Sequence, residues 1–181
     1  MINAYDTWNT FIKGLNSIDE KYLFIKSNMI HNIPPYPYAT VGILTPYIQD
    51  KDSLRGTITH SYNGTGITMQ SMKEPQISFS LTFYTDNYES VFKFMQDTIN
   101  WLETRGKQYL FEHDIILVEH SNFIDKSTIL ETEYVYKYGF DVRFRVADIV
   151  SMDIDNIESV EVKNKVNNEN LTIEGGNKLN G

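Results

Sequence analysis

The chain has 181 residues, 41% of them apolar and 22% charged, which suffices for one ordinary hydrophobic core. Its 24 acidic and 16 basic side chains give a formal charge of −8, which argues against a free-standing nucleic-acid-binding protein because Lys and Arg carry non-specific phosphate affinity. The absence of cysteine excludes disulfides, thiolate metal ligands and cysteine nucleophiles. No signal-peptide pattern or membrane-spanning apolar run occurs, so we expect a protein kept in a cytoplasm or built into a particle assembled there.

The first expected elements are a helix over residues 4–15 and a strand over residues 21–26. Asn3 can cap the helix, and Asp6 favours the positive end of the helix dipole. Apolar side chains recur at helical spacing at Tyr5, Trp8, Ile12 and Leu15. The strand is indicated by aromatic and β-branched residues.

Prolines interrupt regular structure after this strand. Residues 31–37 contain three prolines, which lack a backbone N–H and restrict the preceding residue, so this segment is predicted to be a rigid connector. Strand composition resumes at residues 38–44 and ends before Pro46.

A β-hairpin is predicted next, with arms at residues 57–62 and 67–72. The arms flank Asn63-Gly64, a pair that favours a type I′ turn because both residues accept positive φ. Most side chains of the arms are polar, so we expect the hairpin to project from the core.

The clearest strand pattern runs over residues 76–84, where apolar residues alternate with polar ones. A helix of about 17 residues follows from Tyr88, since Asp86 and Glu89 resemble a capping box and an apolar stripe continues to Leu102. We expect this helix to stop at Gly106. Residues 108–111 extend or restart a helical turn.

The second half contains further strands. Residues 114–119 form a compact apolar strand, and residues 128–132 are ambiguous. Residues 134–146 alternate over a length that suggests a bend or a bulge near Gly139. An edge strand is expected at about 157–162.

The expected fold is therefore a single α+β domain over residues 1–163. It has a mostly antiparallel sheet packed by one long helix and a short N-terminal helix, with the hairpin projecting. Residues 164–181 are rich in Asn and Gly and are expected to be a flexible tail, because they cannot bury enough apolar surface to offset their ordering entropy.

No pattern of catalytic or metal-ligating residues stands out. The four histidines, at 31, 60, 113 and 120, lie in no metal-ligand motif, and His113 and His120 point to opposite faces of a strand. Residues 64–66 lack the context of a phosphate-binding loop, and no nucleophile elbow occurs. We therefore expect no enzyme, no cofactor and no metal.

Candidate contact residues lie on the hairpin and on the last long strand. On the hairpin they are His60, Tyr62, Met69 and Met72, and on the strand Arg143 and Arg145. Two guanidinium groups two residues apart on an outward face can grip carboxylates of a neighbouring subunit, or they can be ordinary surface charges. The tyrosines at 134, 136 and 138 are likewise either core or interface residues.

The order of these segments resembles the tail terminator or neck terminator proteins of tailed bacteriophages, also called tail-completion or tail-to-head joining proteins. The matching pieces, within about residues 4–162, are the N-terminal helix, residues 37–41, the strand at 76–84 and the helix from Tyr88 to Arg105. The closing strand at 138–148 with the acidic segment at 157–162 completes the likeness. The motifs are structural, and the tail after Lys163 has no counterpart.

The resemblance implies a structural virion protein at the junction of tail and head, assembled in the host cytoplasm. Such proteins form a homo-oligomeric ring, usually of six subunits, that caps the tail tube and contacts the tube protein, the sheath where one exists, and the head-completion or stopper protein. An acidic lumen would let DNA pass without specific binding. The alternatives are another head–tail connector component such as a stopper, a non-catalytic binding module, and a hydrolase that would need a polar pocket converging on His113 or His120.

Overall fold

The computed structural model describes residues 3–28, 33–49, 56–62, 66–130, 133–154, 159–163 and 170–174. The chain divides into two compact units, which are described separately. The first comprises Met1–Gly56 and Met72–Ile149, and the second comprises Thr57–Ser71 and Val150–Gly181.

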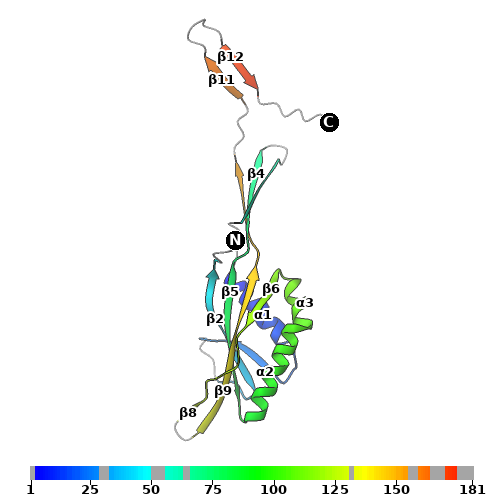
Figure 1. The fold of residues 1–181 in the computed structure, drawn as a ribbon, viewed down its shortest axis with the longest axis vertical. Coiled ribbons are helices and arrows are strands. Elements are labelled where there is room, and N and C mark those ends of the chain that lie inside the picture. Colours follow the sequence, from blue (N-terminus) through cyan, green and yellow to red (C-terminus); the bar gives the residue numbers. More distant parts are fainter. Residues whose placement is uncertain are drawn as a thin grey trace. The chain divides into compact units, whose positions relative to one another are not determined.

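The first unit is built on a seven-stranded sheet (Figure 1). Its strands are β1 (Leu23–Lys26), β2 (Tyr38–Ile48), β5 (Gln76–Thr85), β6 (Ile115–His120), β7 (Ile124–Asp125), β8 (Thr128–Leu130) and β9 (Glu133–Val146). The order is β1-β2-β5-β9-β6, and β7 and β8 also pair with β9. The β1–β2 pair is parallel and the other described pairs are antiparallel, which confirms an α+β fold with a mostly antiparallel sheet.

Three helices accompany this sheet: α1 (Ala4–Leu15), α2 (Tyr88–Glu103) and α3 (Arg105–Phe111). Asn3 caps α1 as expected, with its side-chain oxygen accepting the Tyr5 N–H at 3.0 Å. The α2 cap is Asn87, whose oxygen accepts the Ser90 N–H at 2.8 Å, so the capping role expected of Asp86 is wrong. The amide of Asn87 is one residue nearer the helix and satisfies one of its free N–H groups.

Gly106 does not end a helix, contrary to the sequence expectation. α2 ends at Glu103, and Gly106 lies buried within α3. A Cβ atom on Gly106 would lie 2.5 Å from Cδ2 of Trp101 and 2.6 Å from its carbonyl oxygen. The glycine is needed because α3 turns back closely onto the last turn of α2.

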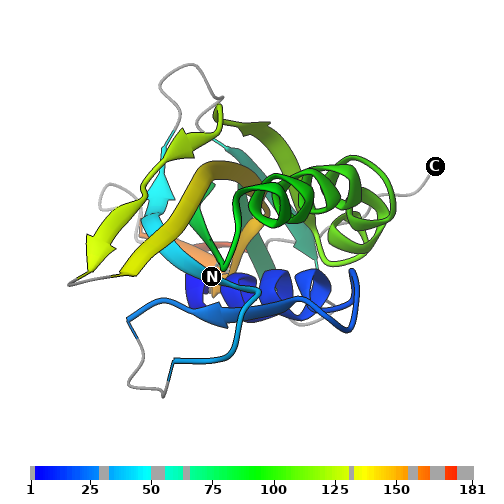
Figure 2. The ribbon, with the colours of Figure 1, turned by 90° about the horizontal axis from the view of Figure 1, so that it is seen from below.

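The core lies between the helices and one face of the sheet, with α1 and α2 against that same face (Figure 2). Phe11 of α1 packs on Phe79 and Phe144, with ring centroids 5.6 Å and 4.8 Å away. Phe94 of α2 packs edge-on against Phe83, with centroids 4.9 Å apart, and stacks on Tyr22 at 3.9 Å. This aromatic packing is the principal source of stability available to a chain without disulfides.

The long strand β9 is regular where a bulge was expected. It pairs with β5 in unbroken register from Tyr136 to Arg145, so of the bend or bulge predicted near Gly139 the bulge is wrong. Irregularities occur instead in β6, between Leu117 and Glu119, and in the second half of β2. β2 continues through Pro46 to Ile48. This is possible because β1 pairs only with residues 38–41 of β2, so from there on one side of β2 makes no ladder hydrogen bonds with β1 and tolerates a proline.

The second unit contains two small sheets. β3 (Thr57–Tyr62), β4 (Ile67–Lys73) and β10 (Asp148–Ile154) form a three-stranded sheet in the order β10-β4-β3, in which β4 and β10 begin or end in the first unit. The turn at 63–65 lies outside the described residues, and the projection of the hairpin stays a prediction. β11 (Ser159–Lys163) pairs antiparallel with β12 (Asn170–Glu174), which lies in the segment expected to be a flexible tail.

Candidate interaction surfaces

The two outward arginines of β9 have carboxylates of their own chain within reach. The Arg143 guanidinium lies 3.0 Å from Glu119 of β6, and Arg145 lies 3.9 Å from Glu74. The Nε of Arg143 is buried without a hydrogen-bond partner. Arg143 therefore joins β9 to β6, and Arg145 lies near the residues between β4 and β5. The role of both arginines in gripping another subunit stays a prediction.

The four hairpin candidates are distributed over two neighbouring strands. His60 and Tyr62 are exposed on β3, Met69 is half-buried on β4, and Met72 is exposed near the end of β4. Every residue of β3 is exposed to solvent, including Ile58. Such a strand offers apolar surface for a contact, and the role of the four residues as contact residues stays a prediction.

The outer edge of β1 is sealed by a side chain. The Asn16 amide donates to the carbonyl oxygen of Phe24 at 3.0 Å, and the Phe24 N–H donates to the Asn16 oxygen at 2.8 Å. The Ser27 N–H donates to the Val41 carbonyl oxygen of β2, so Ser27 directs its backbone groups toward β2. Backbone groups alternate in direction along a strand, and Phe24, three residues earlier, therefore directs its N–H and C=O away from β2. Asn16 thus occupies the position that another strand would take. Sequence analysis missed this role, because an isolated Asn after a helix carries no such signal.

The opposite edge of the same sheet, at β6, has no strand on its outer side among the described residues. Ile116 and Val118 expose 46% and 39% of their surface. β6 contains no proline and no lysine, two residues by which edge strands commonly prevent further pairing.

A tyrosine pair links α2 to the sheet. The hydroxyl groups of Tyr88 and Tyr138 are hydrogen-bonded, and the Tyr138 hydroxyl donates to Asp125 at 3.0 Å. The hydrogen bond from Tyr88, together with burial, raises the pKa of Tyr138. Tyr138 is therefore a core residue, Tyr136 is half-buried, and the side chain of Tyr134 lies outside the described part.

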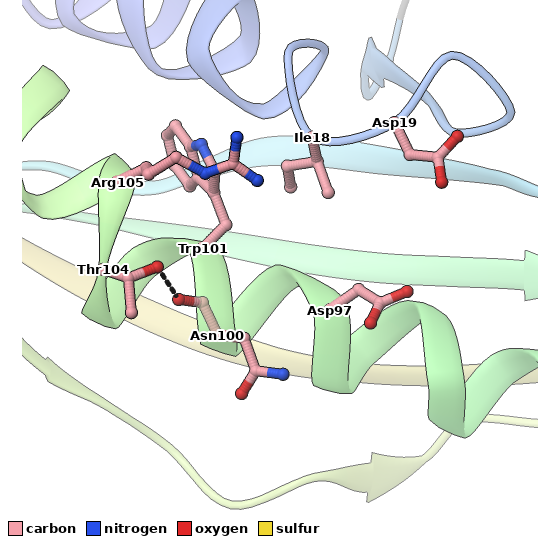
Figure 3. A pocket seen from close by; sticks show the side chains of 7 residues that line it. All are labelled: Ile18, Asp19, Asp97, Asn100, Trp101, Thr104 and Arg105. Carbon is pink, nitrogen blue, oxygen red and sulfur yellow. Dashed lines mark hydrogen bonds between the residues drawn. The ribbon is translucent and has the colours of Figure 1, made fainter.

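A polar pocket of about 270 Å³ lies between α2 and the segment after α1 (Figure 3). Asp97 in it accepts a hydrogen bond from Tyr22 at 2.7 Å, and burial, together with this hydrogen bond, raises the pKa of Tyr22. Asp19 bonds to Lys21 at 2.8 Å, and the same contact lowers the pKa of Asp19. These carboxylates are engaged in holding β1 and its loop, and no nucleophile and base meet in the pocket.

Polar pockets do reach both histidines that a hydrolase would need. His120 lines one with Ser121 and Asp141, and His113 lines another beside α1. However, Nδ1 of His120 faces the Ser121 carbonyl at 3.1 Å and its Nε2 lies 4.0 Å from Glu103, while Nδ1 of His113 faces the Tyr109 carbonyl at 2.8 Å. No imidazole nitrogen is hydrogen-bonded to a hydroxyl within the described ranges, so the nucleophile–base pair of a hydrolase is not assembled there.

The described residues contain neither a metal-binding cluster nor a membrane-spanning helix. No group of three or more His, Asp or Glu side chains is placed to hold a metal ion. No described helix is long and apolar enough to cross a membrane.

Comparison with protein families gives a match to the phage neck terminator proteins over residues 5–170. The chain belongs to the phage neck terminator family. The match covers part of each unit and, apart from Ala4, the three described helices, and it agrees with the resemblance seen in the sequence. A search of curated proteins gives no match.

Membership gives this neck terminator a structural role in joining tail and head and places it at the neck of a phage particle. A protein in that position works by contacts with other components of the particle. The edges and exposed strands described above are therefore more relevant to its function than its pockets.

Proposed function

We propose that this neck terminator forms a ring of six copies that caps the phage tail tube, stops its growth and presents the surface to which the head joins. The family match over residues 5–170 carries the proposal. The ring acts by shape and contact, without catalysis, cofactor or metal, and it assembles in the host cytoplasm. Its neighbours are the tail tube protein, a sheath where one exists, and a head-completion or stopper protein.

The physical properties of the chain support this role. A closed ring needs two different, complementary patches on each copy, and the chain has two unlike strands, β3 and β6, at sheet edges. Each copy carries a formal charge of −8, so a ring lumen of the same sign would repel DNA and let it slide through. Termination follows if the face turned to the head differs from the face that accepts the tube.

The proposal is tested by deleting the hairpin segment 57–72. A Cβ on Gly56 would lie 2.6 Å from the Met72 carbonyl oxygen, so the ends of the segment are adjacent and can be joined by a short linker. We expect a chain with unchanged helix content but with tails of abnormal length or tails that fail to join heads. The exposed-surface variant Lys93→Ala serves as the control.

Two measurements decide between this role and its alternatives. Electron microscopy counts tail lengths and joined particles in the deletion mutant, and normal infectious particles would contradict the proposal. Light scattering gives the mass of the full chain in solution. A monomer at every concentration, with no affinity for tail tubes, would favour the binding-module alternative, and density at the head portal alone would favour a stopper.

A further inference from the structure

The outer edge of β6 can accept a further strand. Its six residues run from Ile115 to His120, and Val118 is the residue that the ladder with β9 skips. Exposed Ile116 and Val118 place β-branched surface beside unused backbone groups. The skipped Val118 and the charged Glu119 restrict which strands can pair here, but no described strand covers the edge.

The edge of β3 has the matching length and exposure. β3 also has six residues, all exposed, and Ile58 exposes 60% of its surface. In the three-stranded sheet its outer side has no further strand among the described residues. Each of the two units therefore has at least one edge strand with no further strand beside it among the described residues.

We propose that β6 of one copy pairs with β3 of the next copy, so that the larger sheet of one subunit continues into the smaller sheet of its neighbour. This inference rests on the proposed ring and names its subunit interface. The contact is heterologous, because each copy gives one edge and receives the other, and such a contact closes into a ring when the rotation allows. β1 cannot replace β6 in this role, since Asn16 blocks it at Phe24.

Charge favours β3 as the partner of β6 because β3 brings no repulsion. Between Lys107 and Lys126 the chain has no basic side chain except histidine, and it has four acidic residues at 112, 114, 119 and 125. Glu119 is the acidic side chain of β6 itself and lies 3.0 Å from Arg143. β3 contains no Asp, Glu, Lys or Arg, so it can lie beside this region without bringing like charges together.

The same argument excludes the other edge of the small sheet. β10 carries Asp148 and Asp153, and the Asp153 carboxylate accepts a hydrogen bond from Thr68 at 2.7 Å. Pairing β10 with the acidic region around β6 would bring like charges together. A two-fold pairing of β6 with a second β6 would do the same and would end at a dimer.

Cross-linking tests the pairing directly, because the chain contains no cysteine of its own. Val118→Cys is combined in turn with a cysteine at each of positions 57–61, and the purified full chain is oxidised. We expect at least one pair to give a ladder of covalent oligomers on a non-reducing gel. The matched control combines Val118→Cys with Met152→Cys on exposed β10, and a second control carries Val118→Cys alone.

Each outcome decides. A ladder only with β3 cysteines supports the pairing, whereas a ladder with Met152→Cys, or a dimer from Val118→Cys alone, overturns it. A ring by light scattering without any β3 ladder overturns the pairing but leaves the proposed function intact. A chain that stays monomeric at every concentration and has no affinity for tail tubes overturns both the pairing and the ring.

A charge on the edge gives an independent measurement. Val118→Lys adds a lysine at an exposed position that makes no ladder pair with β9, so the monomer is expected to keep its circular dichroism spectrum. Its oligomer mass should fall to that of a monomer. Lys107→Glu, an exposed charge change on α3, should leave the mass unchanged, and an intact ring of Val118→Lys would contradict the pairing.

Discussion

Removing the side chain that seals β1 should destabilise the first unit. In Asn16→Ala, the N–H and the carbonyl of Phe24 lose partners at 2.8 Å and 3.0 Å. Each such bond contributes about 1 kcal/mol net, so the loss is about 2 kcal/mol. For a chain of this size that corresponds to a fall in Tm of roughly 4–8 °C. Glu20→Ala, an exposed change in the same loop, should shift Tm by less than about 1 °C.

Asn16→Asp separates the two hydrogen bonds. The carboxylate still accepts the Phe24 N–H but places a second negative oxygen against the Phe24 carbonyl, so at pH 7 this variant should be no more stable than Asn16→Ala. At low pH the protonated carboxyl can donate to the Phe24 carbonyl, so stability relative to Asn16→Ala should return.

Urea unfolding followed by circular dichroism at pH 7 and pH 4 measures both effects. The reasoning is refuted if Asn16→Ala unfolds at the same urea concentration as the parent chain. It is also refuted if Asn16→Asp and Asn16→Ala differ by the same amount at both pH values.

Two further predictions concern packing and alkaline pH. Gly106→Ala forces a Cβ atom to within 2.6 Å of the Trp101 carbonyl oxygen, and the overpacking costs about 1–3 kcal/mol. This cost should exceed the gain in helix propensity of about 1 kcal/mol, so Tm should fall. Lys107→Ala in the same helix should not lower Tm, and an unchanged Tm for Gly106→Ala would contradict the close contact. Burial raises the pKa of Tyr38 to about 12, against about 10 in an unfolded chain, so its contribution to stability is present below pH 10 and is lost between pH 10 and pH 12. Tyr38→Phe should therefore lose less stability than the parent chain over that interval in urea titrations, and equal losses would show that Tyr38 does not ionise late.

The amino-acid sequence determined the elements whose periodicity is long and regular. Residues 76–84 alternate apolar and polar side chains because one face of β5 is buried, and the stripe from Tyr88 to Leu102 follows the period of a helix packed on that face. The resemblance to neck terminators also came from the order of these segments, and the family match confirms it. Burial of one face produces a periodic pattern of apolar residues, so such helices and strands can be predicted from the sequence alone.

Tertiary structure decided everything that depends on residues meeting across the chain. Gly106 has the signature of a helix end, but Trp101 makes it the point of closest approach between two helices. Asn16 becomes a seal on β1 only because the chain brings it beside Phe24, and β6 is open only because no described segment lies beyond it. Whether a strand lies at a sheet edge, and which side chain blocks that edge, depends on residues far apart in the sequence, so a local pattern of residue types does not predict it.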